Sequence, residues 1–259
     1  MTDIGDFSLK SFSLEGRRAV VTGGNSGLGQ AFSVALAKAG ADVLVASVVE
    51  DDGATKALIE ASGSRCELME ADVTAPGAPA RIVDACIEKF GSIDILVNNA
   101  GISRLADVFE FGRAQWDEMV AVNLTAAFEL SREAAQRMVR QGGGKIINVC
   151  SLFSYLGGQG SAAYAATKHG LAGFTKAYCD ELAARNVQVN GIAPGYFATD
   201  LTERTRSDAE ANRRVLEHIP AARWGERLDL MGAVVFLASS ASDYVNGHIL
   251  VVDGGYLVR

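Results

Sequence analysis

The sequence predicts an α/β fold in which one doubly wound parallel sheet carries helices on both faces. Short apolar runs alternate with helical segments, several longer than about 12 residues, and such crossovers join parallel strands in a right-handed sense. The seven predicted strands then take the order 3-2-1-4-5-6-7. A glycine-rich turn directly follows the first of them. No linker, repeat or change of composition divides the 259 residues, which predicts a single domain over residues 1–259.

The composition excludes several classes of function. Hydrophobic residues at 49% and charged residues at 21% are typical of a globular protein. The net charge of −7 argues against nucleic acid as a partner, and no apolar run reaches the roughly 18 residues of a membrane span. Residues 1–10 are acidic and polar where a secretory signal is basic and then apolar, so we expect a cytoplasmic protein without a membrane partner.

The cysteines and histidines indicate neither a metal site nor a disulfide framework. The four cysteines, at positions 66, 86, 150 and 179, form no C-x-x-C pair, and the three histidines show no ligand spacing. Cys150 directly follows the predicted fifth strand, and a packed residue at a strand end explains it better than a reactive thiol.

The first strand is predicted over Ala19–Val21, a short apolar run typical of a buried parallel strand. Residues 1–17 form an arm before it, and we expect Phe7 and Phe12 to dock this arm. Glycines at positions 23, 24, 27 and 29 make the turn after the strand. A helix with regularly spaced apolar residues then runs from Leu28 to Gly40.

Six further strands and six further helices are predicted along the chain. The strands are expected over residues 42–46, 66–70, 93–97, 145–149, 187–190 and 248–252. The helices are expected over residues 50–62, 78–90, 114–141, 162–185, 208–217 and 228–239. Residues 196–226 are otherwise polar and irregular.

The glycine turn predicts a site for a pyrophosphate. Gly23 lets the chain leave the strand, Gly27 lets a phosphate approach the backbone, and Gly29 lets the helix pack close to the sheet. The free N–H groups of a helix N-terminus hold an anion without a cationic side chain. Taken alone, the pattern is equally typical of an ordinary glycine-rich loop. The strand before it and the helix after it favour a dinucleotide.

Ser151, Tyr164 and Lys168 form the candidate catalytic group. Ser151 follows the predicted fifth strand, at the edge of the sheet that also carries the glycine turn. Tyr164 and Lys168 are four residues apart and project from one face of the next helix. A phenol is a poor base near neutrality, but a neighbouring ammonium favours its phenolate. An isolated Y-x-x-x-K pair is more often a half-buried tyrosine and a solvated lysine.

Four motifs in register give the chain a resemblance to the short-chain dehydrogenases/reductases, from about Phe12 to its end. They are Thr22-Gly23-x-x-x-Gly27-x-Gly29, Asn98-Asn99-Ala100-Gly101, Ser151 thirteen positions before Tyr164-x-x-x-Lys168, and Pro194-Gly195. The resemblance implies that Ser151, Tyr164 and Lys168 are catalytic, with Lys168 also holding the nicotinamide ribose. It implies that Asn123 kinks the long predicted helix and holds a water in a proton relay from Lys168.

The resemblance also implies the residues that contact the cofactor. They are Gly23, Asn25, Ser26, Gly27, Leu28, Gly29, Ser47, Asp72, Val73, Asn99, Ala100, Gly101, Tyr164, Lys168, Ile192, Pro194, Gly195 and Thr199.

Charge favours NAD over NADP. No Lys or Arg lies between Arg18 and Lys38, or between Lys38 and Lys56, so a 2′-phosphate meets no cation there. Acidic residues follow the second strand over Glu50–Asp52. Ser47 takes the place of the acid that NAD enzymes usually carry at the strand end.

The chain resembles, within this family, the dehydrogenases that oxidise a secondary alcohol of a keto-deoxy sugar acid such as 2-dehydro-3-deoxy-D-gluconate. The likeness is carried by residues 12–16, 48–50 and 219–255. It implies that Arg104 contacts the substrate carboxylate, beside Ser151 and Tyr164; a surface arginine is the alternative. Gln159-Gly160-Ser161 departs from those enzymes, which have an arginine there, so Gln159 is the corresponding candidate.

Residues of about 196–226 resemble the family's substrate lid. Its arginines are further candidates for binding a carboxylate, although a solvated helix face explains most of them. They are Arg204, Arg206, Arg213 and Arg214.

Three other functions stay open at this point. A gluconate 5-dehydrogenase would use the same site, and a 3-oxoacyl-carrier-protein reductase would want NADPH and a basic patch, which the acidic balance does not favour. An NAD-binding regulator or scaffold would keep the fold without turnover, but the complete catalytic set argues against it. The family further implies a homotetramer that packs through the two long helices and the C-terminal region.

Overall fold

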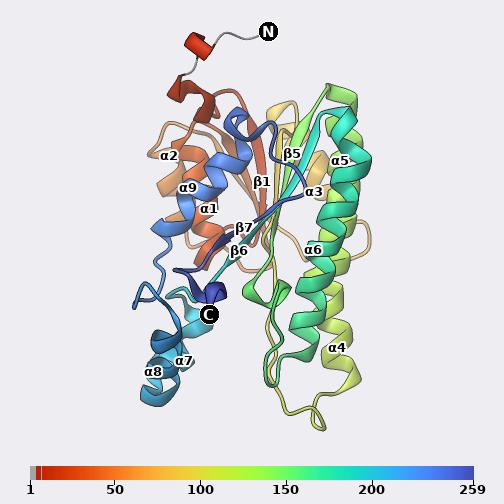
Figure 1. Cartoon of the computed structure of the whole chain (residues 1–259). Helices are drawn as coiled ribbons and strands as arrows, with labels where there is room; N and C mark the ends of the chain where they lie inside the picture. The colour runs from red at the N-terminus through yellow and green to blue at the C-terminus, as the bar shows by residue number, and fades with distance from the viewer. Residues whose placement is uncertain (1–3, 7) are drawn as a thin grey trace.

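The predicted sheet and its strand order are confirmed. A computed structural model describes residues 4–6 and 8–259, and its seven strands all pair in parallel in the order β3-β2-β1-β4-β5-β6-β7 (Figure 1). The strands are β1 (Arg18–Thr22), β2 (Asp42–Ser47), β3 (Cys66–Glu70), β4 (Ile95–Asn98), β5 (Gly144–Val149), β6 (Val187–Pro194) and β7 (Ile249–Val252). This is a Rossmann-type architecture.

Helices cover both faces of the sheet, as Figure 1 shows. One layer contains α1 (Gly27–Lys38), α2 (Ala54–Glu60) and α9 (Leu228–Ala238). The other contains α3 (Ala78–Phe90), α4 (Arg113–Val120), α5 (Ala126–Gln141) and α6 (Ala162–Leu182). Two short helices, α7 (Glu203–Ser207) and α8 (Ala209–His218), project beyond the carboxyl edge of the sheet.

Each strand supplies side chains to two cores because successive residues face opposite sides of the sheet. In β1, Val21 joins the core under α1 and α9, whereas Val20 joins the core under α3 and α5. In β2, Val43 and Leu44 divide in the same way. The two-sided burial explains why these strands are continuous apolar runs in the sequence.

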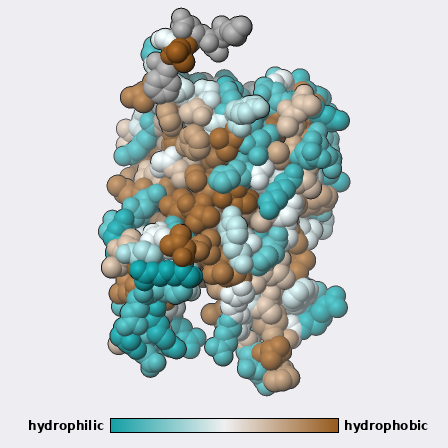
Figure 2. Space-filling view, in the orientation of Figure 1, coloured by the Kyte–Doolittle hydropathy of each residue, from teal (hydrophilic) through white to brown (hydrophobic). Residues whose placement is uncertain are grey.

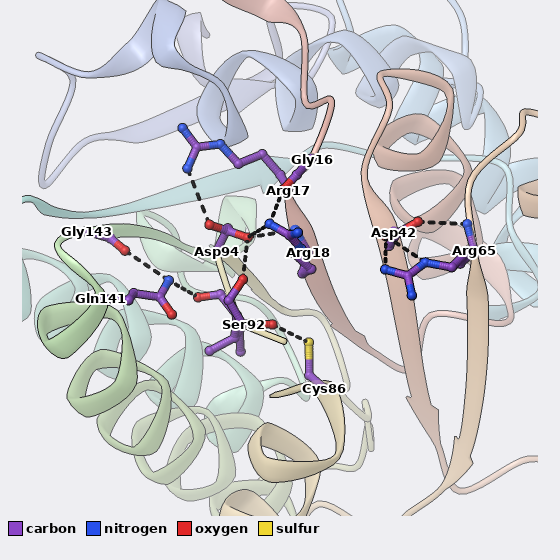
Figure 3. Close-up of polar contacts among 11 residues, drawn as sticks. Gly16, Arg17, Arg18, Asp42, Arg65, Cys86, Ser92, Asp94, Gln141 and Gly143 are labelled. Carbon is purple, nitrogen blue, oxygen red and sulfur yellow. Dashed lines mark hydrogen bonds and ion pairs between the residues drawn. The ribbon is translucent and has the colours of Figure 1, made fainter. Parts of the chain in front are cut away.

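The amino edge of the sheet is held by charged side chains (Figure 3). The Asp94 carboxylate accepts hydrogen bonds from the Arg18 backbone N–H at 2.9 Å, the Ser92 hydroxyl at 3.1 Å and the Arg17 guanidinium at 3.3 Å. The backbone N–H of Arg65 donates to one oxygen of the Asp42 carboxylate at 2.9 Å, and the Arg65 guanidinium donates to the other oxygen at 2.6 and 3.0 Å. These contacts lie at the starts of four strands, β1 to β4, at the edge of the sheet opposite the glycine turn.

The long helix predicted over residues 114–141 is interrupted at the expected place. A π-helical turn over Ala121–Thr125 separates α4 from α5. Buried Asn123 lies within it: its amide donates to the Ile102 carbonyl at 2.8 Å, and its oxygen accepts from the Ile102 N–H at 2.8 Å. The π turn therefore lets one side chain fasten the helix to the segment that follows β4.

Several boundaries differ from the predicted ones. β6 continues four residues past the predicted end, and α2 starts only at Ala54, after Gly53 in the left-handed region at φ +93°. In the arm, Phe12 packs against Phe236 with ring centroids 6.3 Å apart, and Phe7 lies outside the described residues. None of the helices that the structure describes is long and apolar enough to cross a membrane.

Candidate active site

A cavity of about 340 Å³ opens at the carboxyl edge of the sheet. Its walls come from the glycine turn, the ends of β4, β5 and β6, the helix α6 and the start of the 196–226 segment. Figure 2 shows the molecule hollowed at this edge, beside the hydrophilic projection that carries α7 and α8. The predicted residues that line the cavity are Gly23, Ser26, Gly27, Leu28, Gly29, Asn99, Ala100, Gly101, Ser151, Tyr164, Lys168, Pro194, Gly195 and Thr199.

Glycine is required at position 29 by close packing within the turn. A Cβ there would lie 2.0 Å from the Gly23 carbonyl oxygen and 2.4 Å from Nδ2 of Asn99. That Asn99 amide donates to the carbonyls of Thr22 at 2.8 Å and Gly23 at 3.1 Å. The end of β1, the turn and the start of α1 are thereby locked together.

The turn fits the pyrophosphate of a dinucleotide. Ser26 is the N-cap of α1, but its side chain makes no capping hydrogen bond, so the first N–H groups of the helix are left for an anion. Gly27 has a φ of +51°, and a Cβ on it would meet nothing within 4 Å, which leaves room on the phosphate side.

A second cavity, of about 290 Å³, lies at the carboxyl ends of β2 and β3 and includes Ser47 and Asn25. Its charged lining residues are Glu50, Asp51 and Glu70, and no Lys or Arg of the described chain lines it. The Asn25 amide donates to the Val49 carbonyl at 2.7 Å, which joins the glycine turn to the loop after β2. An adenosine ribose bound here would meet negative charge.

Two more of the predicted cofactor residues, Asp72 and Val73, lie just past β3. Asp72 accepts hydrogen bonds from the Thr74 hydroxyl at 2.7 Å and the Thr74 N–H at 2.8 Å. These two bonds lower the pKa of the Asp72 carboxyl below its ordinary value. Val73 is buried in the core under α3, and neither residue lines the two cavities described above.

Lys168 is a buried cation at the centre of the site. Only 5% of it is exposed, and its ammonium donates to the Val149 carbonyl at 2.7 Å. The ammonium nitrogen lies 5.6 Å from the centroid of the Tyr164 ring. It would also lie 3.9 Å from a Cβ on Gly101. In the described part of the chain no carboxylate pairs with Lys168, so its charge acts on the cavity and on Tyr164.

Tyr164 and Ser151 line the same cavity, and the hydroxyl hydrogen of each has no acceptor among the described residues. The Tyr164 ring packs edge-on against Phe153 at 5.6 Å, while its phenol makes no hydrogen bond to any described residue. The Ser151 oxygen accepts from the Phe153 N–H at 3.2 Å, which leaves its own O–H to donate. Ser154, which the sequence analysis missed, bonds the Lys168 carbonyl at 2.8 Å and so links the Ser151 loop to α6.

Asn123 and Ile192 support this cavity without lining it. Ile192 is fully buried within β6. The Asn123 oxygen would lie 3.4 Å from a Cβ on Gly101, and its amide lies 3.4 Å from the Thr167 hydroxyl. The asparagine therefore stands beside the Lys168 end of the cavity.

The two predicted substrate residues Arg104 and Gln159 do not line the cavity. Arg104 forms a paired contact with Glu118 of α4, with nitrogen and oxygen 3.1 Å apart. Gln159 is exposed on its loop. Their substrate roles stay predictions.

Seven further residues, which the sequence analysis did not assign to the site, complete the lining of the cavity. They are Ile102, Val149, Cys150, Phe197, Asp200, Leu201 and Thr202. Each lies within three positions of a predicted site residue in the sequence, and this proximity is the signal that could have found them.

The environment of Cys150 predicts that its thiol does not react in the native protein. Burial raises the pKa of Cys150 to about 11, and it raises those of Cys66 and Cys86 to about 12. At about pH 8, iodoacetamide should therefore modify at most the partly exposed Cys179, whereas the denatured chain should be modified at all four. Mass spectrometry of the peptides measures this, and fast native labelling of Cys150 would contradict it.

Comparisons with known proteins agree with this geometry. A family model described as enoyl-(acyl carrier protein) reductase matches residues 23–257. The chain is 67% identical over 253 residues to YgcW of Escherichia coli (strain K12), an uncharacterized oxidoreductase, with 98% of this chain and 97% of that protein covered. It is 46% identical over 253 residues to 2-dehydro-3-deoxy-D-gluconate 5-dehydrogenase of the same strain, with 97% and 99% covered.

A solved structure is also similar. It is the crystal structure of a gluconate 5-dehydrogenase from Burkholderia cenocepacia J2315 in complex with NADP and tartrate. The TM-score is 0.91 at 38% identity, with 98% of this chain and 100% of that chain covered. From the matching model, these relatives and the sheet topology we conclude that the chain belongs to the short-chain dehydrogenase/reductase family, as an oxidoreductase that acts on CH–OH groups with a nicotinamide cofactor.

Proposed function

We propose that this protein is an NAD-dependent dehydrogenase of a sugar acid, which oxidises a secondary alcohol of a keto-deoxy acid such as 2-dehydro-3-deoxy-D-gluconate. One observation carries the proposal: Ser151, Tyr164 and Lys168 share a cavity with the glycine turn. The name of the E. coli relative at 46% identity supports the substrate class. Tartrate, bound in the Burkholderia relative, is likewise a hydroxy acid.

Three side chains divide the proton chemistry. The Ser151 O–H donates to the oxygen of the reacting alcohol and orients it. Tyr164, as phenolate, accepts the proton of that alcohol and returns it in the reverse direction. The ammonium of Lys168 stabilises the phenolate and, when the cofactor is bound, holds its ribose. The bound nicotinamide supplies the hydride acceptor or donor.

Two groups of residues support these three. Asn123 holds a water that passes the proton between Lys168 and solvent. The glycine turn, with Ser26 and the N-terminus of α1, holds the pyrophosphate, while Thr199 and Gly195 close the cavity near the nicotinamide. The whole chain, residues 1–259, forms one domain, and residues 196–226 form a lid over its substrate site.

The acidic second cavity predicts a preference for NAD. A 2′-phosphate placed beside Ser47 would meet the Glu50, Asp51 and Glu70 carboxylates, so kcat/KM with NAD should exceed that with NADP by at least roughly tenfold. Initial rates with both cofactors measure the ratio, and Glu50→Gln should lower it. Equal rates or faster turnover with NADP, which the Burkholderia relative binds, would overturn the NAD assignment.

NADH formation with a panel of sugar acids tests the substrate class. We expect turnover of 2-dehydro-3-deoxy-D-gluconate, and gluconate is the second candidate because the Burkholderia relative is named for it. Binding of NAD without turnover of any alcohol or ketone would favour a regulator or scaffold. Faster reduction of a 3-oxoacyl carrier protein than of any sugar acid would favour that reductase class instead.

A further inference from the structure

A substrate with a carboxylate needs a positively charged group to bind it. A lysine that lines the main cavity already donates a hydrogen bond to a backbone carbonyl. Lys168 is the single Lys or Arg among its described lining residues, and the ammonium is bonded to the Val149 carbonyl beside Tyr164. The other charged lining residue, Asp200, is acidic. A sugar acid whose alcohol lies at Ser151 and Tyr164 therefore needs a second positive group for its carboxylate.

Most arginines near this edge are paired with acids. Each of the following guanidinium groups contacts a carboxylate: Arg104 with Glu118 at 3.1 Å, Arg213 with Glu217 at 2.7 Å, Arg214 with Glu210 at 4.0 Å and Arg223 with Asp229 at 2.7 Å. A substrate would have to compete with these carboxylates.

Arg206 differs from all of them. It is half-buried in α7, which begins directly after the lining residues Thr199–Thr202, and it forms no ion pair with any described residue. One Nη donates to the Thr199 carbonyl at 3.2 Å. Its Nε is buried and has no hydrogen-bond partner. Burying an N–H of a charged group without a hydrogen-bond acceptor costs free energy, because the group loses its bonds to water. The unpaired Nε therefore indicates an acceptor that a bound ligand supplies.

We propose that Arg206 binds the carboxylate of the substrate and so selects acids over neutral sugars; this rests on the proposed sugar-acid function. The guanidinium fork can offer its orphan Nε and a second N–H to the two oxygens of one carboxylate. Its bond to Thr199 ties it to the wall of the cavity. Substrate binding therefore fastens α7 to the ligand.

Arg204 is the matched control. It lies on the same short helix, two residues away and hence on the opposite side, and it is exposed. Its guanidinium pairs with no described carboxylate. Arg204→Ala removes the same charge from the same helix without removing the proposed contact.

The test compares KM values for 2-dehydro-3-deoxy-D-gluconate and for its neutral methyl ester in the intact enzyme. Arg206→Ala should raise KM for the acid roughly 10- to 100-fold, the usual effect of losing a charged hydrogen bond, and should change KM for the ester and for NAD less than about twofold. Arg206→Lys should recover part of the loss, because it restores the charge but not the fork. Arg204→Ala should match the wild type.

The other outcomes separate the hypotheses. An equal loss for acid and ester would show that Arg206 only holds the Thr199 segment, and a raised KM for NAD would assign it to the cofactor; either result overturns the proposal. Unchanged KM values in Arg206→Ala would also overturn it. If the wild type turns over no sugar acid, the proposed function fails instead, independently of the Arg206 variants.

Discussion

Tyr164→Phe should lower kcat between roughly a hundredfold and ten-thousandfold, the range in which general acid–base groups contribute. The substitution removes the oxygen that we propose accepts the proton of the alcohol, and it keeps the ring that packs on Phe153 at 5.6 Å. The phenol makes no hydrogen bond to the described residues, so its loss should leave the stability of the fold unchanged. Steady-state rates and thermal unfolding of the two proteins measure both effects.

Tyr155→Phe is the control for this substitution. Tyr155 lies four residues after Ser151; its hydroxyl donates to the Ile249 carbonyl at 3.3 Å, and the residue does not line the cavity. It should keep a wild-type kcat. NAD should bind to Tyr164→Phe with an affinity close to that of the wild type. A Tyr164→Phe protein that binds NAD and keeps more than about a tenth of kcat would rule Tyr164 out as the proton acceptor.

Gly29→Ala should destroy the cofactor site. Its Cβ would lie 2.0 Å from the Gly23 carbonyl oxygen, a backbone atom that cannot move without breaking the Asn99 contacts. We expect the turn to shift, NAD affinity to fall by at least roughly a hundredfold, and unfolding to become easier by about 1–3 kcal/mol, as overpacking does. Calorimetric titration with NAD and denaturant unfolding measure the two changes.

Gly232→Ala provides the matched control. Gly232 lies in α9, and a Cβ there would meet nothing within 4 Å. Alanine favours the helix over glycine by about 0.5–1 kcal/mol, so this variant should be as stable as the wild type or more so, with unchanged NAD affinity. Equal behaviour of the two variants would contradict the role given to Gly29.

The strands, and the edge of the sheet where Ser151 and the glycine turn meet, could be predicted from the sequence because both depend on local patterns. A parallel strand buried on two faces is a continuous apolar run, and its carboxyl end fixes where Ser151 and the glycine turn meet. The end of β6 was harder to predict, since Gly191 and Pro194 are usually strand breakers. Gly191 is accepted because a Cβ there would lie 2.7 Å from Ile249 and 3.0 Å from the Cys150 sulfur.

The projecting segment was only partly predictable. The Asp208 side chain caps α8 through bonds to two backbone N–H groups, and this signal is local. By contrast, α7 has five residues, too few to show a helical period. Ion pairs between distant side chains could not be predicted from the sequence either. Glu118, which pairs with Arg104, is fourteen residues away, and only folding brings the two side chains together.

A crystal structure of the protein with NADH and 2-dehydro-3-deoxy-D-gluconate tests the central claim most directly, because both ligands are reduced and the complex cannot turn over. We predict that one secondary alcohol oxygen lies within about 2.5–3.0 Å of both Ser151 Oγ and Tyr164 Oη. A sugar acid whose alcohol groups contact neither oxygen, or a dinucleotide bound away from the glycine turn, would contradict the account.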